Sequence, residues 1–120
     1  MSKTLRIIFI LVVVVISTAI GAHKTIARQD ARHVIRECMA ATEAMEKSPP
    51  GFARADEFVR RIRAIDTKGA PKDLVDALHE HIDLLERSLI AARAGNDTKV
   101  LDAQVAAAKE RFATAVRKYW

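Results

Sequence analysis

Apolar side chains recur every three or four residues along three separate segments of this chain. The three stripes are Ala27, Ala31, Val34, Cys38, Ala41 and Met45; Val75, Leu78, Ile82, Leu85, Leu89 and Ala92; and Leu101, Val105, Ala108, Phe112, Ala115 and Tyr119. Steps of three and four residues place such side chains on one side of an α-helix, and this heptad spacing is typical of bundles and coiled coils. No segment alternates apolar and polar residues as a half-buried strand does. The pattern therefore predicts an all-α chain.

Three clusters of helix-breaking residues separate the predicted helices, at residues 48–51, 67–71 and 95–97. Proline is favoured at a helix start and glycine just past a helix end, which indicates that Pro71 opens a helix and that Gly69 and Gly95 close helices. Short connections make neighbouring helices antiparallel. The sequence therefore predicts a small antiparallel four-helix bundle over residues 23–120. Its helices are expected at about 24–47, 52–67, 71–94 and 97–119.

An apolar run without charge follows a short basic head at the start of the sequence. Its densest part is Ile7, Ile8, Phe9, Ile10, Leu11, Val12, Val13, Val14, Val15 and Ile16. A membrane-spanning helix needs about 20 apolar residues, with about 17 as a minimum, and residues 5–22 reach that length. A basic head, an apolar centre and the small residues Ala19 and Gly21 are also typical of a cleaved signal peptide. We predict that residues 1–22 are an anchor that contacts membrane lipid, with a cleaved signal peptide as the alternative.

Basic residues on both sides of this run bear on where the bundle lies. Lys3 and Arg6 favour a cytoplasmic N-terminus, which places the bundle on the extracytoplasmic side, in the periplasm or outside the cell. Four basic residues between positions 24 and 36 count toward the opposite orientation. We therefore expect an extracytoplasmic bundle. The alternatives are an anchored cytoplasmic bundle and a cleaved, secreted or periplasmic one.

The charge distribution gives no support for nucleic acid as a partner. The formal net charge is only +5, and 15 acidic side chains are interspersed with the basic ones after residue 29. In the densest basic cluster, between residues 54 and 63, Asp56 and Glu57 stand four residues before Arg60 and Arg61. This order favours ion pairs within a helix. We interpret the cluster as a solvated, salt-bridged face, with contact to an anionic lipid headgroup as the alternative.

No residue pattern typical of catalysis or of cofactor binding occurs in the sequence. It lacks a nucleophile elbow, a glycine-rich phosphate loop and a cluster of zinc ligands, so we expect a non-enzymatic protein without a cofactor. The nearest approach to a metal site is His79 with Asp76 and Asp83, which stand three and four residues away. Such residues share one side of a helix, but a solvated face with local ion pairs is the more ordinary interpretation.

Cys38 is the single cysteine and belongs to the first apolar stripe. Free cysteine is among the most buried residue types, so a small buried hydrophobe is expected here. An intermolecular disulfide is the alternative for an exported chain, because one cysteine has no internal partner.

Four apolar residues lie off the main stripes: Ile35, Met39, Leu84 and Ile90. In an isolated bundle of this size, such side chains would face water or a partner. The sequence therefore predicts a membrane-anchored extracytoplasmic bundle that mediates protein–protein interaction, associates with itself or belongs to a membrane complex. The alternative is a soluble periplasmic bundle that senses or carries a small ligand or a metal.

Overall fold

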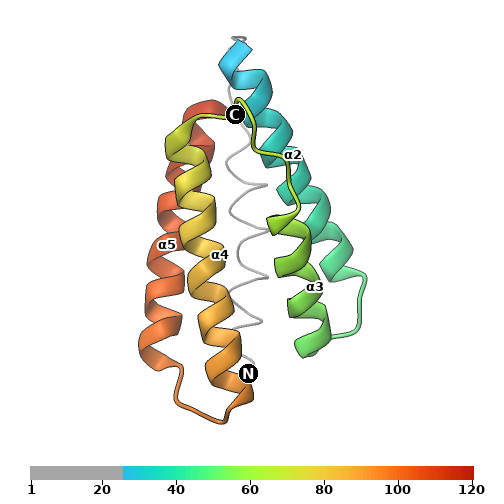
Figure 1. Cartoon of the computed structure of the whole chain (residues 1–120), viewed down its shortest axis with the longest axis vertical. Helices are drawn as coiled ribbons and strands as arrows, with labels where there is room; N and C mark the ends of the chain where they lie inside the picture. Colours follow the sequence, from blue (N-terminus) through green and yellow to red (C-terminus); the bar gives the residue numbers. More distant parts are fainter. Residues whose placement is uncertain (1–25) are drawn as a thin grey trace.

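A computed structural model describes residues 26–120 of the chain, with side chains from residue 29 onward. This part consists of four α-helices: α2 (Ile26–Glu46), α3 (Phe52–Arg63), α4 (Lys72–Arg93) and α5 (Lys99–Tyr119) (Figure 1). No strand occurs between residues 26 and 120, so the prediction of an all-α fold is confirmed for this part. The predicted anchor or signal peptide at residues 1–22 lies outside the described residues, as does the expected helix start near residue 24. Among the described helices, none combines the length and the apolar character needed to cross a membrane.

The four helices form a compact bundle in which consecutive helices run in opposite directions. Asp73, at the start of α4, accepts hydrogen bonds from Tyr119 at 2.7 Å and from Lys118 at 3.2 Å, at the end of α5. Ser88, near the end of α4, donates to Asp102 near the start of α5 at 2.7 Å. Figure 1 shows the α2–α3 pair beside the α4–α5 pair, with the C-terminus at the end of the bundle where α2 begins. The predicted helical bundle is therefore confirmed.

Each helix buries a wider face than its apolar stripe alone. In α2, Ile35 and Thr42 join the stripe residues in the core at 1% and 2% exposure, and in α4 His81 and Ser88 are fully buried. A helix that contacts neighbours on two sides buries more than a single seam. The expectation that Ile35 faces water or a partner is therefore wrong, because this side chain is part of the core.

α3 ends at Arg63, earlier than the predicted end near residue 67. The carboxylate of Asp66 accepts the backbone N–H of Lys68 at 3.0 Å, and the carbonyl of Thr67 accepts that of Ala70 at 3.0 Å. These local bonds give the backbone partners outside a helix, as short polar side chains often do. The chain therefore leaves α3 before it reaches Gly69.

α4 ends in a Schellman arrangement that requires a left-handed residue. The N–H of Gly95 donates to the carbonyl of Ala92 at 3.1 Å, and the N–H of Asn96 donates to that of Ala91 at 3.0 Å. Gly95 has a φ of +76°, where a side chain is disfavoured. Nothing lies within 4 Å of the place that a Cβ atom would take there, so the requirement for glycine comes from the backbone alone.

Replacing Gly95 with alanine should therefore lower the free energy of unfolding by about 1 kcal/mol, because the left-handed conformation strains an alanine backbone. Gly95→Asn should lose less, since asparagine tolerates this conformation better. Urea denaturation of the two variants and the parent measures the difference. An alanine variant as stable as the parent would contradict this account of the helix end.

Candidate functional site

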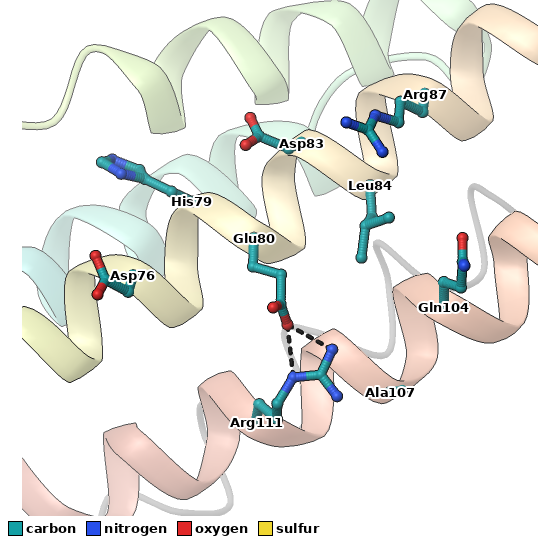
Figure 2. A pocket seen from close by; sticks show the side chains of 9 residues that line it. All are labelled: Asp76, His79, Glu80, Asp83, Leu84, Arg87, Gln104, Ala107 and Arg111. Carbon is teal, nitrogen blue, oxygen red and sulfur yellow. Dashed lines mark hydrogen bonds and ion pairs between the residues drawn. The ribbon is translucent and has the colours of Figure 1, made fainter.

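An open groove of about 700 Å³ runs along the outer side of the α4–α5 pair (Figure 2). Its walls come from six residues of α4 and three of α5: Asp76, His79, Glu80, Asp83, Leu84, Arg87, Gln104, Ala107 and Arg111. Figure 2 shows Leu84 pointing from α4 toward α5, and Glu80 reaching across to Arg111. The guanidinium of Arg111 donates to Glu80 at 2.5 Å. The groove therefore forms where α4 and α5 pack side by side.

The antiparallel register of α4 and α5 determines which residues face each other across this groove. The Asp73–Lys118 and Glu80–Arg111 pairs fix the register. Continued along the helices, this register brings Leu84 opposite Ala107, Arg87 opposite Gln104 and Ala91 opposite Val100. One end of the groove therefore carries ion pairs, and the other, lined by Arg87 and Gln104, leads toward Val100.

Ile90 and Val100 are the most exposed large apolar side chains among the described residues, at 63% and 72%. Neither residue lines the groove, but Ile90 lies one helical turn beyond Arg87 and Val100 lies one turn before Gln104, so both lie past the same end of it. The spacing of apolar residues in the sequence indicated Ile90 but not Val100. Val100 comes to lie near the groove only through the pairing of α4 with α5. Leu84 is half-buried at the floor of the groove, whereas Met39 is half-buried against the core from α2.

The acidic residues of the groove already have basic partners. Asp76 accepts from Lys72 at 2.6 Å, Asp83 accepts from Arg63 at 2.8 Å, and Glu80 pairs with Arg111. Arg87 makes no ion pair with any described residue and is the one cation of the groove left without a carboxylate in this part of the chain.

His79, Asp76 and Asp83 do not converge as metal ligands. Figure 2 shows the three side chains spread along the outer side of α4. Both carboxylates are engaged by basic residues, which compete with a cation. Between residues 26 and 120, no group of three or more His, Cys, Asp or Glu side chains is placed to hold a metal ion. The ordinary interpretation, a solvated face with ion pairs, describes these residues.

Cys38 is only 1% exposed and lies among core residues of the bundle. Burial, together with the nearby charge of Glu37, raises the pKa of this thiol to about 12, so the reactive thiolate is disfavoured. A thiol without access to solvent cannot reach the thiol of another chain. The buried-hydrophobe interpretation therefore fits Cys38 in the folded bundle, and the intermolecular disulfide does not.

His81 is a buried base at the contact between α4 and α5. Its side chain is fully buried, and neither ring nitrogen makes a hydrogen bond of ordinary geometry. Burial and, to a smaller extent, the positive charge of Lys109 lower the pKa of His81 from 6.5 to about 4, while a backbone contact with Val105 opposes the shift. The side chain of Lys109 is itself only 11% exposed. The folded bundle therefore holds His81 neutral at pH 7.

The stability of the bundle should consequently fall as the pH drops from about 6.5 to about 4. In that interval the unfolded chain binds a proton on His81 that the folded chain does not, and protonation favours unfolding by up to about 3 kcal/mol. Urea denaturation at a series of pH values measures this loss. His81→Leu should flatten the dependence in this interval, whereas His79→Gln, which changes an exposed histidine two residues away, should leave it as in the parent. Equal pH dependence in the parent and His81→Leu would rule out this origin.

Comparison of the chain with protein-family models, with curated proteins and with solved structures found no match. The case for a function therefore rests on the residues and geometry described above.

Proposed function

We propose that this protein is a non-enzymatic interaction protein that is anchored in a membrane by residues 5–22 and presents its bundle outside the cytoplasm. In this proposal, the α4–α5 groove receives a helix of a partner protein, which makes the chain an adaptor or a component of a membrane complex. The apolar run supports the anchor, and its basic head supports the orientation. The observation that carries the interaction is the exposure of two large apolar side chains, Ile90 and Val100, beyond the same end of the groove.

Burial of apolar area supplies the attraction for such a partner. A large aliphatic side chain contributes about 1.5–3 kcal/mol when it passes from full exposure to full burial. Ile90 and Val100 still have most of that contribution to gain, because both are more than half exposed. Leu84 and Ala107 extend the apolar surface along the groove floor. Two or three apolar side chains of a partner helix fit this arrangement.

Charge complementarity defines the partner further. Arg87 lies between Leu84 and Ile90 along α4 and has no carboxylate partner among the described residues. A partner helix that carries an acidic residue beside its apolar residues would pair with Arg87 while its apolar residues contact Leu84 and Ile90. A charge-assisted hydrogen bond with Arg87 at a partly desolvated interface favours this partner over one that carries a basic residue at the same place.

A photoreactive amino acid placed at Ala107 in the full-length chain should form a covalent adduct with the partner in cells. The same amino acid at Ala53, an exposed alanine of α3, is the matched control and should form none. Ile90→Ala combined with Val100→Ala should reduce the adduct at Ala107 about tenfold, through lost apolar burial, and Arg87→Glu should reduce it through charge reversal.

The mass of the adduct distinguishes a different protein from a second copy of this chain. Equal adducts at Ala107 and Ala53, or no adduct at Ala107, would contradict the assignment of the groove as the docking surface.

Alkaline phosphatase fused after Trp120 should be active, because this reporter folds only outside the cytoplasm, and the fusion should remain with the membrane fraction. A green fluorescent protein fusion at the same position reports the opposite orientation. N-terminal sequencing of the membrane-bound protein should find an intact start. A mature chain that begins at Ala22 would instead establish the cleaved alternative, and an inactive phosphatase would establish a cytoplasmic bundle.

A further inference from the structure

A second pocket, of about 320 Å³, lies between the end of α2 and α3. Its polar side is formed by Lys47, Ser48, Arg54, Arg61 and the carboxylate of Glu57, and its apolar side includes Met45 and Phe58, both almost completely buried. This pocket belongs to the other helix pair and shares no residue with the α4–α5 groove. It therefore requires a separate explanation.

Arg54 is the residue of this pocket whose charge is not balanced. It makes no ion pair with any described residue, and one of its guanidinium nitrogens, Nη1, donates to the backbone carbonyl of Ser48 at 3.3 Å. Its Nε is buried and has no acceptor. A buried N–H without an acceptor is costly, more so when it carries charge. An oxygen of a bound anion would satisfy this group.

The position of Arg54 in its helix adds to this imbalance. Arg54 is the third residue of α3, and the first turn of α3 holds no acidic side chain. The start of a helix carries partial positive charge, so an anion is stabilised there and a cation is not. Arg54 thus adds a full positive charge at a place that already favours a negative group.

The neighbouring basic residues share too few carboxylates. Arg60 and Arg61 both bind Glu57, Arg60 through its Nε at 2.9 Å and Arg61 through its Nε at 3.4 Å. Lys47 lies 3.4 Å from Glu43 in an exposed pair, which is worth little. The lining of the pocket itself holds three cations, Lys47, Arg54 and Arg61, and one carboxylate, Glu57. The local charge is therefore positive.

The other basic residues near α3 do not share this excess. Arg63 donates to Asp83 and Glu86 of α4 at 2.8 Å each, and Arg93 of α4 pairs with Asp56. The sequence predicted that Asp56 would pair within its own helix, but in the structure it forms an ion pair with Arg93 of α4. The solvated, salt-bridged face is thus the right interpretation for one side of α3, and Arg54 lies outside it.

We propose that the pocket between α2 and α3 binds a phosphate group. Arg54 and Arg61 contact the phosphate oxygens, and Ser48 lies at the same wall, where its hydroxyl donates to the carbonyl of Ala44 at 3.1 Å. Guanidinium groups suit phosphate because they donate parallel hydrogen bonds to two of its oxygens. A soluble phosphate ester and the headgroup of an anionic lipid share this chemistry. This binding is independent of the partner helix proposed for the α4–α5 groove.

The test follows the ¹H–¹⁵N signal of the Arg54 Nε group in the full-length chain, held in zwitterionic detergent micelles. Phenyl phosphate should shift this signal in a saturable way, as the buried N–H gains an acceptor. Arg54→Gln should weaken phenyl phosphate binding, followed by calorimetry, at least tenfold. Arg117→Gln is the matched control, because it removes the same charge from an exposed site on α5, and it should change binding less than twofold. Arg61→Gln, which should also weaken binding, serves if the Arg54 variant fails to fold.

A second arm replaces phenyl phosphate with phosphatidylglycerol added to the micelles. A saturable shift with phenyl phosphate alone identifies a soluble ester as the source, a shift with the lipid alone identifies a headgroup, and either result supports the site. No saturable shift with either probe would overturn the proposal. Equal weakening by Arg54→Gln and Arg117→Gln would also overturn it, since the attraction would then depend only on net charge.

Discussion

The packing of α4 against α5 is the interaction on which the other features of this bundle depend. It is the most extensive helix–helix contact of the described part, and both helices bury large side chains completely, among them Leu78 and Ile82 of α4 and Phe112 of α5. Each contributes about 1.5–3 kcal/mol through burial. Because side chains interdigitate in such a contact, the register is fixed along its whole length. The same register determines which outward-facing residues meet across the groove.

Two polar contacts within this interface have opposite effects on its stability. Asp102 is nearly buried, yet both of its carboxylate oxygens accept hydroxyl hydrogen bonds, from Ser88 at 2.7 Å and from Thr98 at 2.9 Å. A buried carboxylate with such partners specifies the register without a large penalty. His81 has no comparable partner and adjoins Lys109, so it is tolerated only while neutral. The α4–α5 contact thus combines a buried polar group that has hydrogen-bond partners with one that lacks them.

Sequence spacing predicted the core of each helix well and its flanks poorly. Leu78, Ile82 and Leu85 follow directly from the heptad pattern, because that pattern describes one seam. Ile35 did not follow, since a helix in a bundle touches neighbours on two sides. The pairing of Asp56 with Arg93 could not be predicted either, because spacing along one helix contains no information about which charges of another helix lie opposite. The groove and the α2–α3 pocket could not be predicted for the same reason, because each forms where two helices meet.

The pairing of α3 with α4 explains why the two surfaces differ in chemistry. Arg63 and Arg93 form ion pairs across this contact, so the basic residues nearest α4 are neutralised and the α4–α5 groove is left nearly balanced, with Arg87 as its exception. On the side of α3 that faces α2, Glu57 must serve both Arg60 and Arg61, and Arg54 lacks a carboxylate. Apolar exposure with balanced charge suits a protein partner, whereas a partly enclosed pocket with excess positive charge suits a small anion. The distribution of acidic residues among three helices therefore gives one small bundle two surfaces of different charge, on which the two proposals rest.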